Sequence, residues 1–254
     1  MSVRTSSATK ARANNGKPAI RQRSQKSIIY PESDGKPMSD NTKQYDWITR
    51  IKGGLESRFN SDPKVFVAGD LLWYPVKGNP KACTAPDVMV VIGRPKGHRG
   101  SYRQWEEAGI TPQVVFEIWS PSNSTKDKED KLAFYQRYGV EEYYAYDPDT
   151  EIMEGWLRQG RKLESIAEMR DWKSPLLGVT FKRFSGAWNL YHPNGEPFVL
   201  YEEMFVQRDE ARENAKAERA AKEAERAAKE AERAAKEAAW AKLRELGIDP
   251  ETLK

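Results

Sequence analysis

The sequence has few of the residues that build disulfides or soft-metal sites. Its 254 residues include one cysteine, Cys83, and two histidines, His98 and His192. A single cysteine excludes an internal disulfide and a thiolate zinc cluster, and two distant histidines do not favour a His-rich metal site. No apolar run reaches the ~18 residues that a membrane-spanning helix needs, and no secretory signal pattern opens the chain. We therefore expect a cytoplasmic protein without a membrane partner.

Common cofactor and catalytic motifs are missing as well. The sequence contains no GxGxxG, GxxxxGK[ST], GxSxG, HExxH or CxxC pattern. Dinucleotide-binding proteins, P-loop enzymes, serine hydrolases and zinc peptidases therefore lack the residues that their chemistry needs. A basic, glycine-rich segment at 93–100 is compatible with a phosphate-binding loop and with an ordinary solvated loop. The sequence leaves both interpretations open.

Charge is distributed unevenly, although the net charge is only +4. Residues 1–39 carry eight Lys or Arg against two acids, residues 40–201 carry 22 of each sign, and residues 202–254 carry twelve bases against fourteen acids. The first segment has almost no large apolar residues, so we expect a disordered basic arm over 1–39. The neutral 40–201 segment does not indicate nucleic-acid binding by its bulk charge.

Residues 40–201 have the patterning of one folded domain. Apolar residues at helical spacing predict a first helix that ends near Asn60, with Asp40 or Thr42 as its cap. A second helix should cover about 127–138 and stop at Gly139. Strands are expected where β-branched and aromatic residues gather, at 65–74, 88–92, 114–119, 142–146, 151–158, 161–167, 179–181 and 198–200. This order predicts an α/β or α+β fold with a mixed β-sheet.

The C-terminal segment repeats with a period of seven. The heptad AKEAERA occurs twice in succession from residue 221, and a related heptad follows it. Its alanines are spaced three and four apart, which is the pattern of a coiled-coil seam. Glu-to-Lys pairs four residues apart accompany it at Glu218–Lys222, Glu225–Lys229 and Glu232–Lys236. We expect one long helix over 202–246, followed by a tail at 247–254. Both a self-supporting charged helix and a homodimer through this helix fit the pattern.

Several charged residues stand where a folded core does not favour charge. Asp87 immediately precedes the apolar run at 88–92, and Glu117 lies inside an apolar strand. A buried carboxylate is costly unless it is paired, protonated or bound to a metal. Lys131 shares a helix face with three aromatic residues, so its side chain should point towards the sheet. A structural salt bridge would explain each residue alone, but together they indicate a site.

Two carboxylates and a lysine are sufficient for metal-dependent phosphodiester cleavage. Hard carboxylate oxygens hold Mg²⁺, which keeps several waters and bridges to substrate phosphate. The metal activates a bound water and stabilises charge in the transition state, while a lysine orients or activates the attacking water. We therefore interpret Asp87, Glu117 and Lys131 as a candidate catalytic set, with Mg²⁺ or Mn²⁺ as cofactor. Asp70, which follows a glycine in the first strand run, is a further candidate ligand.

The same residues resemble a known nuclease family. Pro86-Asp87, then a strand bearing Glu117, then a helix–strand unit resemble the PD-(D/E)xK nuclease superfamily. More closely, FEIWSP at 116–121 and YQRYGVEEYYAYDP at 135–148 look like the Uma-type restriction endonuclease family of bacteria. The resemblance covers about residues 40–200. It implies a restriction-endonuclease-like sheet flanked by helices, DNA as substrate, and Asp87 and Glu117 as metal ligands.

One departure from the superfamily pattern concerns its lysine. That lysine stands two residues after the glutamate, where this chain has Trp119, and Lys131 looks like its migrated substitute. The first helix of such nucleases often supplies an acid as well, which makes Glu56 a candidate metal ligand. The leading hypothesis is a Mg²⁺-dependent DNA endonuclease. A nuclease-derived DNA-binding protein without catalysis, and an assembly protein that acts through the heptad helix, are the alternatives.

Overall fold

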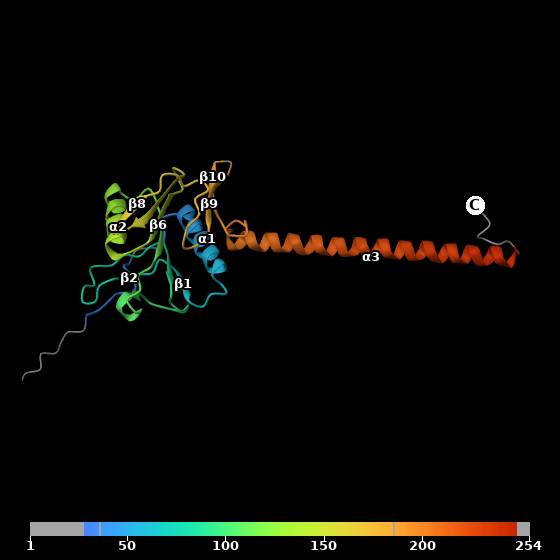
Figure 1. Ribbon diagram of the computed structural model, residues 1–254, viewed down its shortest axis with the longest axis horizontal. Coiled ribbons are helices and arrows are strands. Elements are labelled where there is room, and N and C mark those ends of the chain that lie inside the picture. The colour runs from blue at the N-terminus through green and yellow to red at the C-terminus, as the bar shows by residue number, and fades with distance from the viewer. Residues whose placement is uncertain (1–27, 36, 185, 248–254) are drawn as a thin grey trace, which may run out of the picture.

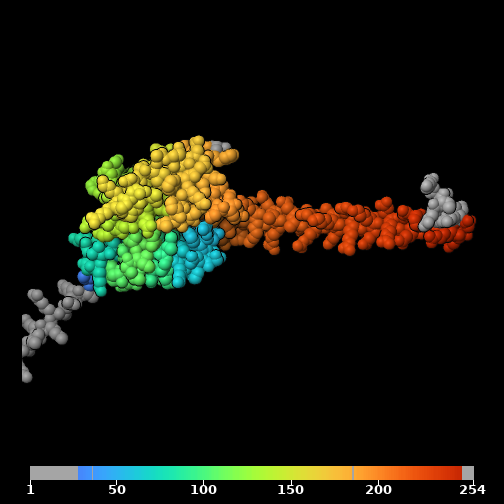
Figure 2. Space-filling view, viewed as in Figure 1, coloured from blue at the N-terminus to red at the C-terminus, as the bar shows by residue number. Residues whose placement is uncertain are grey.

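The computed structural model describes residues 28–35, 37–184 and 186–247. Most of the predicted basic arm, and the tail after residue 247, lie outside these described residues. The described chain forms a body of β-strands flanked by helices, from which one long helix projects (Figures 1 and 2). This is the mixed α+β architecture that the order of helices and strands predicts.

The body is built on a six-stranded mixed sheet. Its strand order is β1-β3-β5-β6-β7-β8, with β5 and β6 parallel and the other neighbours antiparallel. The parallel pair is connected by a helix, α2, as a parallel crossover requires. The bounds are β1 Val65–Gly69, β3 Val88–Ile92, β5 Val114–Ile118, β6 Glu142–Asp147, β7 Ile152–Gln159 and β8 Lys162–Ser165.

Two helices cover opposite faces of this sheet. Helix α1 (Thr42–Arg58) buries Ile48, Ile51 and Leu55 against one set of strand residues. Helix α2 (Thr125–Tyr138) buries Tyr135 against the other set. Successive strand residues point to opposite faces, so Phe116 and Ile118 contact the α1 side of the core while Val115 and Trp119 contact the α2 side. Glu117, which lies between Phe116 and Ile118, therefore faces α2.

The helix ends follow local capping chemistry. Asn41, rather than the predicted Asp40 or Thr42, caps α1, because its side chain accepts a hydrogen bond from the Gln44 N–H. Helix α2 begins with a capping box between Ser124 and Asp127. It ends, as predicted, at Gly139, which has the left-handed conformation at φ 91°.

Two predicted strands differ from the structure. The run at 65–74 is divided into β1 and β2 (Trp73–Tyr74) because Asp70 has a positive φ of 48°, which ends β1. β2 leaves the main sheet and pairs in parallel with β4 (Tyr102–Arg103), which is followed by the short 3-10 helix η1 (Gln104–Glu106). Residues 198–200 form no strand.

A hairpin outside the main sheet contains the strand expected at 179–181. It consists of β9 (Thr180–Phe184) and β10 (Ala187–Tyr191), and it packs on the α1 side of the core. Phe198 is not in a strand but is buried against α1. Its ring packs so closely on Gly54 that a Cβ atom at that position would lie only 2.2 Å from the ring. From the sequence alone, an apolar residue that packs between two elements cannot be distinguished from an apolar residue in a short strand.

The C-terminal helix α3 (Tyr201–Glu245) agrees closely with the predicted span. It extends away from the body, and none of its residues is buried (Figure 1). The predicted Lys222–Glu218 and Lys229–Glu225 pairs form, each at 2.6 Å, whereas Lys236 lies over the Trp240 ring. Among the described residues, none of the helices combines the length and hydropathy of a membrane span.

Candidate active site

Asp87 and Glu117 meet at one end of the central strands. β3 and β5 are antiparallel with Val88 opposite Phe116, which brings the start of β3 beside the end of β5. The Asp87 side chain is only 9% exposed, and its Oδ2 accepts a hydrogen bond of 2.6 Å from the Ile118 N–H. The Glu117 carboxyl group is near enough for its charge to raise the pKa of Asp87. Strand register therefore places two acids, distant in sequence, side by side.

The Glu117 carboxyl group is buried and held by α2 through both of its oxygens. Oε1 accepts a hydrogen bond from the Tyr135 hydroxyl, and Oε2 lies 2.5 Å from the Lys131 Nζ. Burial raises the pKa of Glu117 above the usual carboxyl range, against the opposing effect of Lys131. Burial and the nearby Glu117 charge raise the pKa of Asp87 well above its ordinary value. Both acids thus hold their protons more tightly than exposed carboxyl groups do.

Lys131 reaches this pair from the facing helix. Its side chain is 27% exposed, and its Nζ also lies 3.4 Å from the Ala85 carbonyl oxygen. Burial opposes its charge, but the Glu117 and Asp87 carboxylates outweigh that effect, so the pKa of Lys131 is raised. Lys131 is therefore a stable cation here. The structure brings together the three residues that the sequence singled out, although they come from three separate elements.

A pocket of about 570 Å³ opens beside this cluster. Asp87, Lys131 and the exposed Asp70 line it, while the buried Glu117 contacts Lys131 and is not among the lining residues. The Asp70 N–H donates to the Asp87 carbonyl oxygen at 3.2 Å, which fixes the two residues next to each other. Burial and the Asp34 charge raise the pKa of Asp70. The pocket also contains other polar groups, among them Asp34, Asp40, Gln44, Thr84, Ser122, Asn123 and Asp127.

Glu56 is not brought to this pocket. It is exposed on α1, forms an ion pair of 2.8 Å with Lys52, and lines other hollows of the surface. The α1 residue at the site is Gln44 instead, whose Nε2 donates to the Ile118 carbonyl oxygen at 2.7 Å. Gln44 shares a helix face with Ile48 and Ile51, so a polar residue in that apolar stripe was the signal that could have identified it.

A hydroxyl cluster beside β5 was also missed by the sequence reasoning. The Ser120 Oγ donates to the Asp40 Oδ2 at 2.5 Å, and the Ser122 hydroxyl donates to the same carboxylate oxygen. These contacts tie the segment before α1 to the segment that follows β5. No spacing rule in the sequence predicts this contact, because Asp40 and Ser120 are eighty residues apart.

Trp119 stands two residues after Glu117, where the resemblance to PD-(D/E)xK nucleases leads one to expect a lysine. Its ring is buried on the α2 side of the sheet, in the cluster that contains Tyr135. Lys128 lies over the ring at 5.3 Å from its centroid. Trp119 is thus part of the hydrophobic core, and the cation that contacts Glu117 is Lys131 of α2.

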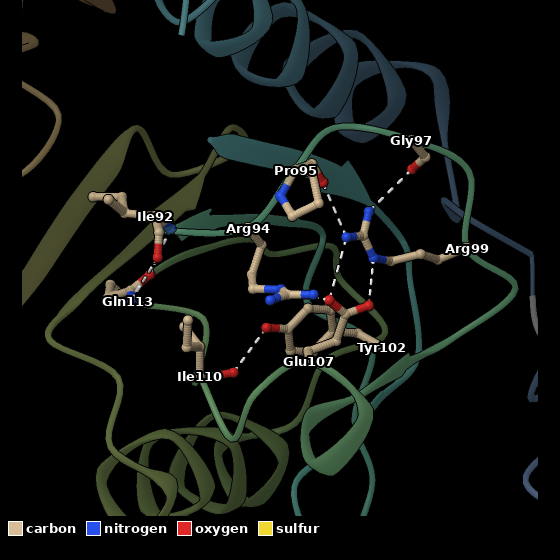
Figure 3. Close-up of polar contacts among 9 residues, drawn as sticks. All are labelled: Ile92, Arg94, Pro95, Gly97, Arg99, Tyr102, Glu107, Ile110 and Gln113. Atoms are coloured by element: carbon tan, nitrogen blue, oxygen red, sulfur yellow. Dashed lines mark hydrogen bonds and ion pairs between the residues drawn. The ribbon is translucent and has the colours of Figure 1, made fainter. Parts of the chain in front are cut away.

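The glycine-rich loop at 93–100 uses its arginines internally. Arg94 and Arg99 both pair with Glu107, at 2.7 and 2.6 Å, and Arg99 also donates to the carbonyl oxygens of Pro95 and Gly97 (Figure 3). Hydrogen bonding from Arg99 is the largest of the effects that lower the pKa of Glu107. Of the two interpretations, the structure favours a structural loop whose arginines are already engaged.

The donor set is that of a hard cation. Among the described residues, no group of three or more His, Cys, Asp or Glu side chains is arranged to hold a metal. Mg²⁺ usually requires only one or two carboxylates, since waters and substrate phosphates complete its coordination. Asp87 and Glu117, with Asp70 in the same pocket, are therefore compatible with such an ion.

Comparison with known proteins gives a family. No curated protein matches the chain. A solved structure, titled as a putative nuclease belonging to DUF820 from Anabaena variabilis ATCC 29413, is similar with a TM-score of 0.43 and 18% identity, over 56% of this chain and 77% of that one. The model of the Uma2 family, described as "Putative restriction endonuclease", matches residues 35–181, which is more than half of the chain and includes the whole Asp87–Glu117–Lys131 cluster. The chain therefore belongs to the Uma2 family.

Proposed function

We propose that this protein is a metal-dependent DNA endonuclease in which Asp87 and Glu117 hold a divalent cation, Mg²⁺ or Mn²⁺, and Lys131 acts on the attacking water. The observation that carries the proposal is the Lys131–Glu117 contact of 2.5 Å beside Asp87, at the edge of an open pocket. Membership of a family described as restriction endonucleases supports a nuclease. DNA hydrolysis and the metal are our extension of that membership.

Each residue of the cluster would have a separate task. Asp87, held by the Ile118 N–H, offers a carboxylate to the pocket from a rigid strand end. Glu117 would be the second ligand, and the Tyr135 hydroxyl fixes its orientation from behind. When bound, the cation would act as a Lewis acid that lowers the pKa of a water and offsets charge on the phosphate. Asp70 is a further candidate ligand at the pocket surface.

In the metal-free protein the Glu117 and Asp87 carboxylates favour the protonated form of Lys131 and raise its pKa. A lysine that stays protonated is a hydrogen-bond donor and not a base. Lys131 would therefore orient the attacking water or stabilise the negative charge that develops on the phosphate, as fixed donors do in other active sites. Its position on a packed helix keeps this charge in place before substrate arrives.

The test is nicking of supercoiled plasmid by the purified protein. Wild type should convert the plasmid with Mg²⁺ or Mn²⁺ and not with EDTA, and Glu117→Ala should not convert it under any of these conditions. Calorimetry of Mg²⁺ binding to both proteins gives a second readout. Absence of cleavage on several DNAs together with absence of metal binding would contradict the proposal and favour a catalytically silent DNA-binding protein.

Lys131→Ala separates the catalytic role from a structural one. The variant should fold and bind Mg²⁺ almost as wild type does, because Lys131 is not a metal ligand in the proposal, yet cleavage should be lost. If the variant instead unfolds, the Lys131–Glu117 pair is structural and the assignment of Lys131 is wrong. The homodimer through α3 stays a prediction, which the association state of a chain lacking 207–246 would test.

A further inference from the structure

Strand β5 continues past the start of β3 at the candidate site. β3 begins at Val88, which lies opposite Phe116, so Ile118 at the end of β5 has no partner in β3. The residue that would face Ile118 in the continued register is Pro86. Proline has no N–H and cannot donate to the Ile118 carbonyl oxygen. The ladder between β3 and β5 therefore ends with a backbone carbonyl group that needs a donor from elsewhere.

Two side chains complete the hydrogen bonding of Ile118. Its N–H donates to the Asp87 Oδ2 at 2.6 Å, and its carbonyl oxygen accepts from the Gln44 Nε2 at 2.7 Å. Asp87 and Gln44 thus bind the same residue, one at each of its backbone polar groups. Glu117 immediately precedes Ile118. Gln44 therefore contacts the part of β5 that carries one candidate metal ligand and donates to the other.

The Gln44 side chain is itself held in one orientation. The residue is only 7% exposed, and its Oε1 accepts a hydrogen bond of 2.7 Å from the Asp40 N–H. The Gln44 N–H donates to the Asn41 Oδ1 at 2.9 Å in the cap of α1. Because a backbone donor engages the amide oxygen, the amide nitrogen is the atom directed at Ile118. This arrangement favours a role through Ile118 over a role as a metal ligand.

A second contact joins the same two segments. The Ser120 Oγ donates to the Asp40 Oδ2 at 2.5 Å, and the Ser120 N–H donates to the Asn123 Oδ1 at 2.8 Å. The start of α1 is thus attached to the end of β5 at Ile118 and to the following segment at Ser120. Gln44 belongs to a connection made of several hydrogen bonds, which restricts the movement of α1 against β5.

Gln113 makes a similar contact at the opposite end of β3. Its Oε1 accepts from the Ile92 N–H at 2.8 Å, and its Nε2 donates to the Ile92 carbonyl oxygen at 3.3 Å (Figure 3). Ile92 is the last residue of β3. Gln44 lines the pocket beside Asp87, whereas Gln113 is not among its lining residues. Two glutamines therefore complete strand ends in the same way, and one of them does so at the candidate site.

We propose that Gln44 is a positioning residue of the candidate active site, which holds the end of β5 so that Asp87 and Glu117 keep the spacing that a cation requires. This inference rests on the proposed function, in which these two acids hold a divalent cation. Gln44 does not bind the cation and acts through Ile118. Groups that orient metal ligands in this way affect metal affinity although they do not touch the metal.

The experiment compares Gln44→Met with the matched control Gln113→Met in the full chain. Methionine has nearly the volume of glutamine but no N–H group, so each variant loses the side-chain bonds to one strand end. Calorimetry measures Mg²⁺ affinity, and urea unfolding measures stability. The affinity should fall about 10–100-fold in Gln44→Met and stay near that of wild type in Gln113→Met, although both variants should lose stability. Wild-type affinity in Gln44→Met, or an equal loss in both variants, would overturn the inference.

A second variant, Gln44→Glu, separates positioning from metal binding. An ionised glutamate can still accept from the Asp40 N–H but cannot donate to the Ile118 carbonyl oxygen. At pH 8 it should therefore weaken Mg²⁺ binding as methionine does. Binding as tight as that of wild type, or tighter, would show that position 44 acts as a ligand position and would contradict the inference. Failure of both Gln44 variants to fold would contradict it as well, since the residue would then support the fold as a whole.

Amide hydrogen exchange in EDTA provides a readout without metal. Gln44→Met should speed exchange of the Ile118 N–H, which is bonded to Asp87, and leave that of the Ile92 N–H unchanged, whereas Gln113→Met should do the reverse. Unchanged exchange at Ile118 would overturn the inference. A wild type that neither binds Mg²⁺ nor nicks plasmid, with Ile118 exchange still dependent on Gln44, would contradict the proposed function and leave the positioning of Asp87 intact. A wild type that binds Mg²⁺ and nicks plasmid equally well without Gln44 would contradict this inference alone.

Discussion

Glu117 and Glu142 are both buried in neighbouring parallel strands, but their surroundings differ. Glu117 is near the end of β5, in contact with Lys131 and Tyr135 and close to Asp87, beside a pocket. Glu142 begins β6 at the opposite end of the sheet, as its pairing with Val114 shows. Its carboxyl accepts hydrogen bonds from the hydroxyls of Ser174 and Tyr144 and, at 2.7 Å, from the Leu176 N–H.

The difference shows what distinguishes a site from a structural acid. Both acids are buried with hydrogen-bond donors to both oxygens, but the donors to Glu142 are neutral hydroxyl and N–H groups that fix the turn at 174–176, whereas one of the donors to Glu117 is the charged Lys131. Glu117 is surrounded by other charged groups, and burial raises its pKa despite the lysine. Burial of a carboxylate alone does not indicate catalysis. The second acid and the cation beside a pocket are the features on which the proposed site rests.

The largest expected effect is the loss of cleavage in Glu117→Gln. This change keeps the volume of the side chain but removes its charge, and the rate should fall by about 10²–10³-fold or more, as when one charge-stabilising group is removed from an active site. Glu142→Gln is the matched control, because it makes the same change in an equally buried strand position. Initial rates of plasmid nicking under Mg²⁺ check both. Equal nicking rates in the two variants would show that Glu117 and Glu142 do not differ in their role in cleavage.

Glu142→Gln should lower the stability of the protein and leave its cleavage rate unchanged. In Glu142→Gln the amide must direct its NH₂ group at one of the former donors, and an unpaired buried group costs about 1–3 kcal/mol. The free energy of unfolding in urea should fall by that amount, whereas the rate per folded molecule should stay near that of wild type. A stable Glu142→Gln protein would show that water or a shifted side chain satisfies the lost bond.

Tyr135→Phe should have an intermediate effect. The change removes only the hydroxyl that donates to Glu117 Oε1 and leaves the buried ring in place. A hydrogen bond to a charged group contributes about 1.5–3 kcal/mol, so we expect a roughly tenfold lower cleavage rate with unchanged DNA affinity. Rates measured at several Mg²⁺ concentrations test whether the loss is partly restored by excess metal. Wild-type rates at all concentrations would show that the hydroxyl has no positioning role.

Asp87→Asn should separate function from stability. Burial and the Glu117 charge raise the pKa of Asp87, so the folded state holds its proton at pH values where the unfolded chain has lost it. Stability of the metal-free protein should therefore fall as pH rises from the ordinary carboxyl range through the raised folded pKa. Asparagine can still accept from the Ile118 N–H and has no charge, so this slope should flatten.

At pH 8 the Asp87→Asn protein should be more stable than wild type by about 1 kcal/mol, while cleavage is lost. Thermal unfolding from pH 5 to pH 8 in EDTA, with nicking assays on the same samples, checks both statements. A variant less stable than wild type at pH 8 would show that the Asp87–Lys131 attraction outweighs the repulsion by Glu117.

The smallest effect is expected from removing most of α3. Its residues are exposed, and the Arg50–Glu203 ion pair of 3.1 Å, near its start, is retained when residues 207–254 are deleted. The free energy of unfolding of the body should change by less than about 0.5 kcal/mol, as for other surface changes. Urea unfolding and plasmid nicking of the shortened chain provide the test. A large loss of either would show that α3 supports the body or the site.

Much of the fold could be predicted because its signals are local. The start and end of β3, the glycine that ends α2, and the long α3 follow from apolar spacing and capping chemistry, which act over a few residues. Errors arose where a distant partner decided the conformation. The strand predicted through Asp70 is divided by the positive φ of that residue, and its second part, β2, pairs with the distant β4. Phe198 packs in the core against Gly54 and is not part of a strand.

The candidate site shows the same division. Asp87 and Glu117 interrupt apolar runs, and Lys131 interrupts an aromatic stripe, so the cost of burying charge makes them visible in the sequence. Glu56 was selected by its place in the first helix alone, and the structure brings Gln44 to the pocket instead. Nothing local distinguishes a helix residue that faces the pocket from one that faces solvent near it.

The sequence by itself determined most of the helices and strands of the fold, which charges are costly to bury, and where basic residues concentrate. These depend on the chain's own periodicity and composition. Only the tertiary structure decided that Lys131 contacts Glu117 and that Arg94 and Arg99 are occupied by Glu107. The physical reason is that charge interactions depend on distance and burial, and strand register and helix packing fix both across residues far apart in the chain.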